Sequence, residues 1–337
     1  MTRRTVGRVQ RRRALGLASS ALVLALLAAL AVVVLTTADD SPGRARGQAG
    51  GEPVAAVGTP SVAPRLRGEV AGTIGVLSFN ALKYLGPKRA LHDWRRVARR
   101  TDVDLIGWQE TRNDPWADAA AAFEGEGWRT WQYPDLSGPK QLAVSWRPDV
   151  LRLVDVTWQR VHDGATPRET ERPFPARYVV RARFVHRASG LTVTLLNTHL
   201  NHAIETGHGF DDNLNARRAK QHLRVLSRMW DRTPGDVVLG TGDYNFDQAD
   251  DAAYRPAGGI SRRFAGRAVS SYDALGTDGV VPTLRTRWID YVWVSAATLR
   301  GPLGAGPDGH AQLVTHRSLG GYRSDHRPLL ARVRLYA

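Results

Sequence analysis

Acidic, amide and histidine side chains, the residue types that bind cations and transfer protons, recur at the ends of apolar runs in this chain. In the first half, Asn80 follows the run that ends at Phe79. Gln109 and Glu110 follow the run that ends at Trp108. In both places a polar residue comes directly after a candidate hydrophobic strand, where the chain leaves the apolar interior.

The same arrangement returns in the second half of the chain. His199 lies just past the apolar part of LTVTLLNTHLNH, and VVLGTGDYNFD places Asp243 and Asn245 after another apolar run. Asp290 lies inside the apolar segment WIDYVWV, where a charge is costly unless it is paired. Asp325 and His326 come just before the last strand candidate.

Each of these features also has a purely structural explanation. Asn80 and Asn245 could cap turns, because short amide side chains bond to nearby backbone groups. A lone histidine such as His199 is more often a structural residue than a catalyst. The segment GTGD could be an ordinary exit from a strand. Taken singly, these features therefore indicate little, and only the whole set is informative.

As an ordered set, the short motifs FN, QE, NTHL, GDYN, IDYV and SDH resemble the endonuclease/exonuclease/phosphatase proteins. This group includes deoxyribonuclease I, exonuclease III-type repair nucleases, inositol polyphosphate 5-phosphatases and bacterial sphingomyelinases. The resemblance covers roughly residues 73–337. It implies an α/β fold, a four-layer sandwich of two mostly antiparallel β-sheets flanked by helices, with the strand ends gathering the motif residues in one cleft.

The resemblance also implies a role for each motif residue on the metal side of this cleft. Glu110 would be the principal carboxylate ligand of a divalent ion, with Asn80 beside it and Asp325 as a further carboxylate on the metal side. Mg²⁺ suits such oxygen ligands best, and Mn²⁺ or Ca²⁺ would also fit. Arg112 in QETR would reach a phosphate, with an exposed salt bridge as an equally good interpretation.

On the catalytic side, the resemblance implies that Asp243 orients or deprotonates the attacking water and that Asn245 helps to position it. His326 would contact the scissile phosphate, with Asp290 fixing its tautomer. His199 would bind a phosphate oxygen or assist the leaving group. Hydrolysis of a phosphodiester requires charge neutralisation, an activated water and help for the leaving oxygen, and these residue types supply all three.

Two other classes of protein stay open at this point. A binding module could use the same fold without turnover, although Glu110, Asp243 and His326 are all present. A glycosidase could use Glu110 with a second carboxylate, but that interpretation leaves His199 and the Asp290–His326 pair unexplained. Chelation would separate the two enzymes, because a glycosidase with two carboxylates needs no metal.

Hydrophobic periodicity predicts the core and the elements that would position these residues. The predicted core contains Trp94, Trp108, Trp146 and Trp293. Three other tryptophans could be buried or exposed: Trp116, Trp128 and Trp131. The stretch 201–212 is a predicted loop at the rim of the cleft. Helices are expected over 88–100, 114–123 and 213–230, and strands over 73–79, 103–108, 142–146, 151–160, 178–186, 191–198, 237–241, 288–294 and 329–335.

The N-terminal region cannot belong to a folded core. An arginine-rich head precedes an uncharged run from Ala14 to Ala38, which is long enough to cross a bilayer. The length favours a signal anchor over a cleaved signal peptide. Residues 1–38 would then be head and anchor, 39–67 a flexible linker, and 68–337 the catalytic domain outside the membrane. A cleaved signal would instead release that domain as a secreted protein.

The substrate is less well defined by the sequence than the reaction. The net charge is +15, which suits an anionic partner such as nucleic acid or a phospholipid surface, but a solvated basic surface explains it equally well. The chain has no cysteine, which excludes disulfides and lipoprotein acylation. A phosphoester substrate is expected, with a nuclease or general phosphodiesterase favoured over an enzyme acting on lipid or inositol phosphates. No protein partner is predicted.

Overall fold

The computed structural model describes residues 68–111, 114–135 and 138–337. The predicted anchor, the predicted linker and Arg112 lie outside these residues. Among the helices of the described residues, none has both the length and the apolar character needed to cross a bilayer.

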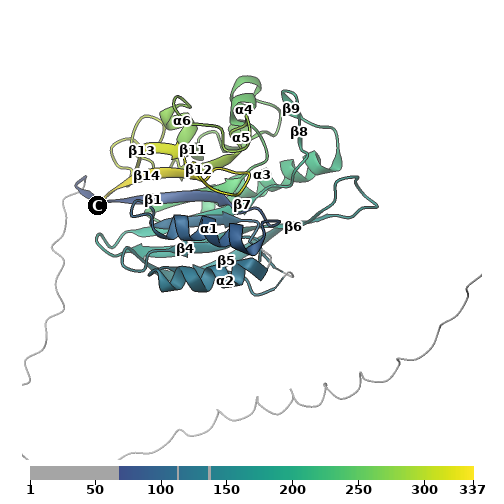
Figure 1. Cartoon of the computed structure of the whole chain (residues 1–337). Coiled ribbons are helices and arrows are strands. Elements are labelled where there is room, and N and C mark those ends of the chain that lie inside the picture. Colours follow the sequence, from purple (N-terminus) through teal and green to yellow (C-terminus); the bar gives the residue numbers. More distant parts are fainter. Residues whose placement is uncertain (1–67, 112–113, 136–137) are drawn as a thin grey trace, which may run out of the picture. The chain divides into compact units, whose positions relative to one another are not determined.

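Two six-stranded sheets form the centre of the fold (Figure 1). Neighbouring strands are antiparallel except for the pairs β1–β2 and β7–β10. The first sheet has the order β13 (Ala311–Ser318), β14 (Leu329–Tyr336), β1 (Val70–Asn80), β2 (Leu105–Gln109), β4 (Val144–Trp146) and β3 (Arg129–Trp131). The second sheet has the order β11 (Ala268–Ser270), β12 (Asp290–Ser295), β10 (Val237–Asp243), β7 (Thr192–His199), β6 (Phe174–His186) and β5 (Leu151–Ala165).

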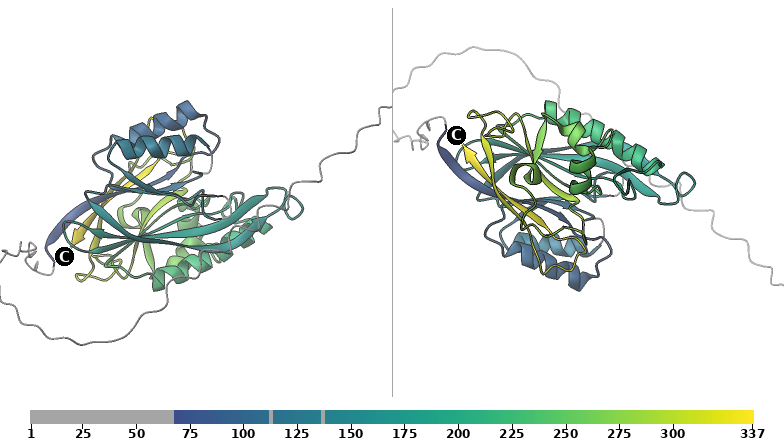
Figure 2. Two further views of the ribbon diagram at one scale, coloured as in Figure 1. Left: turned by 90° about the horizontal axis from the view of Figure 1, so that it is seen from below. Right: turned by 90° about the horizontal axis from the view of Figure 1, so that it is seen from above.

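Helices cover the outer face of each sheet, and Figure 2 shows the resulting four layers. Helices α1 (Pro87–Ala98) and α2 (Asp114–Gly125) lie outside the first sheet, and α3 (Leu214–Arg232) and α5 (Ile260–Phe264) lie outside the second. The expected four-layer sandwich is confirmed. Two further short helices, α4 (Gln248–Tyr254) and α6 (Ser271–Leu275), and a two-stranded ribbon of β8 (Glu205–Thr206) and β9 (Gly209–Phe210) complete the described elements.

Helix α1 shows how an amphipathic sequence fixes its own packing. Pro87 stands at the start, where its missing N–H costs nothing. Trp94 and Val97 are buried while the arginines point outwards. The Trp94 ring stacks on Trp108 of β2 with centroids 4.6 Å apart. This contact fixes the helix over the first sheet and confirms both tryptophans as core residues.

The burial of the remaining tryptophans largely agrees with the prediction made from their apolar neighbours in the sequence. Trp146 and Trp293 are buried, as expected. Of the three left open, Trp116 and Trp128 are also buried. Trp131 is only partly buried against the core between the sheets. Most of the tryptophans therefore stabilise the fold and are not available for ligand contacts.

Strand alternation decides which residues point between the two sheets. On β1, Leu77 and Phe79 pack with the outer helices, whereas Ile74 and Val76 pack between the sheets. Because side chains alternate along a strand, Ser78 and Asn80 must continue the inner row, and Asn80 ends it. The same rule applies to β10, where Leu239, Thr241 and Asp243 form the inner row. The interior thus changes from apolar to polar along the strands.

Several short elements were not expected from the sequence. Strand β3 and strand β11 have three residues each, which is too short for a periodic signal. Strand β13 has a register shift between Leu313 and Thr315, so its inward residues do not alternate regularly. The predicted rim loop 201–212 contains the ribbon of β8 and β9.

Candidate active site

The strand registers bring the polar ends of five strands to one edge of the sandwich. His199 pairs with Asp243 across the parallel strands β7 and β10, and Asp243 pairs with Asp290 across β10 and β12. Asn80 pairs with Gln109 across β1 and β2, which places Glu110 just beyond the same edge. These pairings explain why motifs far apart in the sequence meet.

Asp243 is the centre of the cluster and is only 2 % exposed. Its Oδ2 accepts a hydrogen bond of 2.9 Å from Nδ2 of Asn80, and its Oδ1 accepts one of 2.8 Å from the backbone N–H of Asn245. Burial raises the pKa of the Asp243 carboxyl, but His199 and His326 more than offset burial and hold this pKa well below its usual range. Asp243 is therefore an ionised carboxylate held in a fixed orientation.

His326 lies between two carboxylates. Its Nδ1 is 2.8 Å from Oδ2 of Asp290, and its Nε2 is 3.8 Å from Oδ2 of Asp243. Burial lowers the pKa of His326, but the two carboxylates outweigh burial and raise the pKa to about 10. With both nitrogens protonated, the ring is a cation that can bind a phosphoryl oxygen without losing its anchor on Asp290.

The neighbours of His199 determine where its proton lies. The guanidinium of Arg177 is 3.4 Å from Nδ1 of His199, and an arginine can only donate. Nδ1 is therefore the acceptor, and the neutral ring carries its proton on Nε2, which lies 3.3 Å from Oδ2 of Asp243. Burial and the charge of Arg177 lower the pKa of His199. The proton on Nε2 thus points into the cluster.

Glu110 and Asn245 adopt a backbone conformation that residues other than glycine rarely use. Their φ angles are +63° and +52°, and such strained residues gather at functional sites. The Glu110 side chain, 14 % exposed, accepts a 3.0 Å bond from the backbone N–H of Lys83, and the Lys83 ammonium lies 3.6 Å from its Oε1. Burial raises the pKa of Glu110, but His199 and Lys83 outweigh it, so this carboxyl is ionised.

The donor set around Glu110 fits a hard divalent cation. Asn80 accepts a single 3.0 Å hydrogen bond on Oδ1, from the backbone of Leu82, and an amide oxygen has a second lone pair. Together with the Glu110 carboxylate it offers oxygen ligands at adjacent strand ends, as Mg²⁺-type ions prefer. The ammonium of Lys83 against Glu110 shows that the position attracts positive charge.

Asp243, Asp290 and His326 also form a compact group with ligand atoms within 4.8 Å of one another. A proton on His326 explains the closeness of these three side chains as well as a bound metal ion would. With its raised pKa, the His326 ring is a cation that lies between the two carboxylates. This group and the Asn80–Glu110 pair are therefore two neighbouring places where positive charge can be held.

Three further site residues were predicted from the sequence: Asp325, Asn245 and Arg112. Asp325 is exposed and acts on the cluster through its charge, which raises the pKa of His326. Asn245 donates from Nδ2 to the backbone carbonyl of Leu200 at 3.1 Å, and the same atom lies 3.2 Å from Nε2 of His199. Arg112 is outside the described residues.

Three residues that the sequence did not single out support the cluster. Arg177 and Lys83 hold His199 and Glu110, as described above. Asp93 on α1 is 2 % exposed and accepts hydrogen bonds from the backbone N–H groups of Arg323 and Ser324, at 2.7 Å and 2.8 Å. An acidic residue within the basic helix was the available signal for Asp93, which orients the loop that carries His326.

The family model for the endonuclease/exonuclease/phosphatase family matches residues 77–326, most of the chain. The chain belongs to this family. The resemblance read from the six motifs is confirmed. Members of the family are phosphoesterases and nucleases, and members typically use a divalent metal. A search among curated proteins finds no match.

Solved structures share this fold at low sequence identity. An endonuclease/exonuclease/phosphatase protein from Bacteroides vulgatus has a TM-score of 0.56 and 18% identity, covering 78% of this chain and 99% of that one. D. rerio TDP2 complexed with a single-strand DNA product has a TM-score of 0.55 and 14% identity, covering 77% and 98%. A mannosyl-6-phosphatase from Bacteroides thetaiotaomicron has a TM-score of 0.52 and 17% identity, covering 77% and 99%.

Proposed function

We propose that this protein is a metal-dependent phosphoesterase that hydrolyses phosphodiester bonds with an activated water. The observation that carries the proposal is the buried group of Asp243, His326 and Asp290 beside the oxygen ligands of Asn80 and Glu110. This arrangement combines an ionised carboxylate, a cationic imidazole and a candidate cation site at one edge of the sandwich.

Each side chain has a separate task in this proposal. A divalent cation held by Asn80 and Glu110, with Mg²⁺ the best fit, would neutralise charge on the phosphoryl oxygens. Asp243 accepts a hydrogen bond from the attacking water and orients it towards phosphorus. The cationic ring of His326 binds a second phosphoryl oxygen, where negative charge grows in the transition state. Asp290 holds that ring in place.

His199 and Asn245 complete the site beside Asp243. The N–H at Nε2 of His199 can donate to a phosphoryl oxygen or to the leaving oxygen, because Arg177 orients the ring from the other side. Asn245 donates to the backbone of Leu200, which keeps its amide close to Asp243. These fixed donors need no reorganisation during the reaction, which is the main source of electrostatic catalysis.

The substrate class is proposed to be nucleic acid. The fold is shared with D. rerio TDP2, whose structure holds a single-strand DNA product, and the basic surface of this chain suits a polyanion. A phosphomonoester is the second candidate substrate, because a mannosyl-6-phosphatase has the same fold. Lipid or inositol phosphates are the third alternative.

The decisive test combines chelation with two substitutions. The purified protein is assayed with bis-p-nitrophenyl phosphate, a single-stranded oligonucleotide and a sugar phosphate, with Mg²⁺ or with EDTA. Activity should disappear with EDTA and in Glu110→Gln, and it should fall strongly in His326→Asn. A folded, Mg²⁺-loaded protein that cleaves none of these substrates, nor a phosphoinositide, would overturn the proposal in favour of a binding module.

The site is further proposed to act outside the cytoplasmic membrane. The support is the arginine-rich head followed by the uncharged run Ala14–Ala38, which would leave the catalytic domain on the outer side. Protease added to intact cells should remove the activity from the membrane fraction if the helix is an anchor. Activity in the culture medium would indicate that the N-terminal segment is cleaved as a signal peptide. Activity confined to the cytosol would contradict both the anchored and the secreted form.

A further inference from the structure

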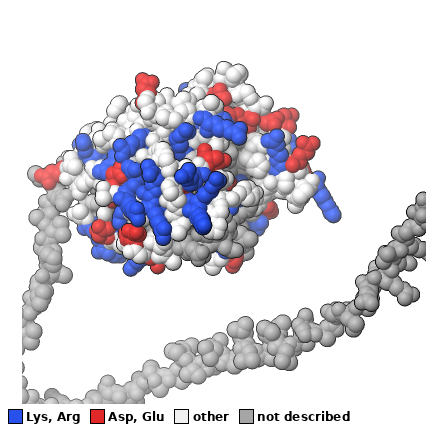
Figure 3. Space-filling model, viewed as in Figure 1, with Lys and Arg blue, Asp and Glu red and all other residues white. Residues whose placement is uncertain are grey.

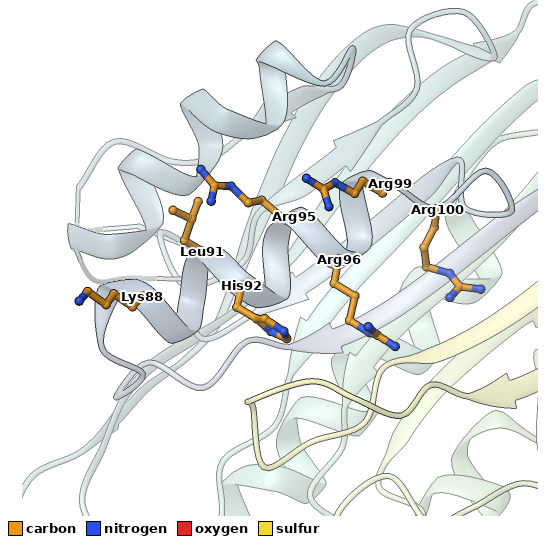
Figure 4. Close-up of a pocket in the computed structure, with 7 residues that line it drawn as sticks. All are labelled: Lys88, Leu91, His92, Arg95, Arg96, Arg99 and Arg100. Atoms are coloured by element: carbon orange, nitrogen blue, oxygen red, sulfur yellow. The ribbon is translucent and has the colours of Figure 1, made fainter.

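The outward face of α1 is a continuous basic stripe, called here the α1 groove. Its residues recur every three or four positions, so they share one side of the helix. Figure 4 shows their side chains along this side, next to the loop that precedes β14. The groove encloses about 720 Å³ and is lined by Lys88, Leu91, His92, Arg95, Arg96, Arg99 and Arg100.

Four cations of the groove have no acidic partner in the described part of the fold, whereas several arginines elsewhere on the surface have one. Arg183 pairs with Asp155, and Arg267 pairs with Asp231. At the end of the groove, Arg100 pairs with Asp102 at 2.6 Å. Within the described part of the chain, by contrast, no ion pair is found for Lys88, Arg95, Arg96 or Arg99. The charge of these four side chains is therefore not neutralised by an ion pair within the described residues.

This arrangement costs helix stability. Like charges four residues apart, such as Arg95 and Arg99, repel each other on a helix. The helix dipole favours the arginines of the last turn but disfavours Lys88 at the start, where the first turn has no acidic residue. An anion that runs along the groove would relieve the repulsion. Figure 3 shows lysine and arginine gathered over α1 on this face of the molecule.

The groove is connected to the active site at two points. Lys83, which contacts Glu110, lies only a few residues before the first groove residue, Lys88. In the middle of α1, Asp93 binds the backbone of the loop that carries His326. A chain lying in the groove would therefore have one end close to the site.

We propose that the α1 groove binds the phosphate backbone of a single-stranded nucleic acid and guides it to the active site, an inference that rests on the proposed function for its catalytic meaning. The helix is about 18 Å long at 1.5 Å per residue, which accommodates several consecutive phosphates in a line. Beside Lys83, Tyr84 is 79 % exposed and is available to stack on an unpaired base. A duplex has no such base to offer.

The composition of the groove favours a polyanionic chain over a membrane. Proteins that bind a bilayer surface bury apolar side chains in the interface. Leu91 is the one apolar residue that lines the groove, and it is half-buried. The cations are instead arranged in a row along one helix, which matches the linear spacing of backbone phosphates.

Binding is tested by the fluorescence anisotropy of a labelled oligothymidylate with the full chain, in EDTA so that no cleavage occurs. The variant Arg95→Gln/Arg99→Gln is compared with Arg224→Gln/Arg228→Gln, which removes two exposed cations at the same spacing from α3. Each lost phosphate contact lowers the slope of log affinity against log salt by about 0.7 for single strands. The salt slope should be smaller by about 1.4 for the groove variant than for the unchanged protein. The slope for the α3 variant should be unchanged. Equal changes in the two variants, or no change in either, would overturn the inference.

Two further measurements separate the alternatives. In Mg²⁺, the groove variant should raise the KM for an oligonucleotide at least several-fold more than the KM for bis-p-nitrophenyl phosphate, which is too small to fill the groove. If binding depends on the groove but nothing is cleaved, the inference stands while the proposed function fails. If the groove variant loses binding to phosphatidylcholine–phosphatidylserine vesicles and not to the oligonucleotide, the groove is a membrane contact and the inference is wrong.

Discussion

Two polar layers lie two residues apart on the same strands, and they differ in kind. The inner layer contains Asn197 on β7 and Thr241 on β10, which are paired in register. The outer layer contains His199 and Asp243, one alternation further along both strands. Both layers are buried, so burial alone does not distinguish a structural polar group from a catalytic one.

The inner layer is neutral, and the side chain of Asn197 is fully satisfied. Nδ2 of Asn197 donates to the backbone carbonyls of Trp108 and Ala143, at 2.8 Å and 3.1 Å. Its Oδ1 accepts from Gln109 and Thr241, at 2.9 Å and 3.1 Å. All four hydrogen bonds that an amide can readily form are made, and they join the two sheets.

The outer layer carries charge and displaced pKa values. His199 and His326 lower the pKa of Asp243, and Asp290 and Asp243 raise the pKa of His326 to about 10, in both cases against the effect of burial. Displaced pKa values of buried groups are typical of functional sites. Charge thus lies at the ends of the strands, whereas the layer two residues further inside is neutral.

The largest effect is expected from Asp243→Asn in the outer layer. The asparagine oxygen can still accept from Asn80, but the charge that orients the water is lost. We expect kcat/KM to fall on the order of 10³-fold, as for loss of a general base, with a much smaller change in melting temperature than in the inner-layer variants below. Near-normal turnover of bis-p-nitrophenyl phosphate in this variant would contradict the assignment.

Gly107 in the inner layer should be the most sensitive position for stability. A Cβ here would lie 1.9 Å from Oγ1 of Thr241 and 2.7 Å from Oδ1 of Asn197, so the two sheets would have to move apart. Gly107→Ala should lower the free energy of unfolding by about 3 kcal/mol. Gly125→Ala is the control, because that Cβ has open space around it. Equal stability of the two variants in urea denaturation would show that the sheets are not held at this distance.

Asn197→Leu tests the hydrogen bonds of the inner layer. The substitution leaves two backbone carbonyls and Gln109 without their partner, at a cost of about 2–3 kcal/mol. Thr241→Val removes one donor only and should cost about 1 kcal/mol. Differential scanning calorimetry should rank the variants in this order, and the reverse order would mean that Asn197 is not the main connection.

The smallest effect concerns a third polar cluster on the other face of the second sheet. His162 and His222 are buried with ring centroids 5.8 Å apart, and Thr198 lies 2.8 Å from Nε2 of His222. Burial, helped by the charge of Arg177, lowers the pKa of His162 to about 4. Burial likewise holds the pKa of His222 well below its usual value.

Both histidines are therefore neutral in the folded protein and have a pKa of about 6.5 when it is unfolded. Below pH 6.5 the unfolded state binds protons that the folded state does not, so stability falls as the pH drops towards 4. At pH 5, His162 alone should cost about 2 kcal/mol relative to neutral pH. His162→Gln should remove this part of the acid sensitivity in denaturation curves at pH 7 and pH 5. An unchanged difference between the two pH values would show that His162 titrates normally.

The sequence predicted most of the long elements, while the roles of the site residues stay predictions. The runs at 73–79, 191–198 and 237–241 fall within β1, β7 and β10, except for Leu191 just before β7, because their apolar residues are continuous. The helix expected over 213–230 matches α3, which begins after the capping residue Asn213. Several elements of two to seven residues were not predicted, since they carry too little periodic signal, and the eight-residue strand β13 was also missed.

What the sequence determined by itself is the set of polar residues and their place directly after hydrophobic strands, because local patterning is written in adjacent residues. Only the tertiary structure decided which of them meet. The register of β10 sets Asp243 opposite both His199 and Asp290, and Asp93 holds the loop of His326 from a helix 230 residues earlier in the chain. Arg177 and Lys83 acquire their roles in the same way, since contacts between distant segments depend on how the sheets and helices pack, which no local pattern specifies.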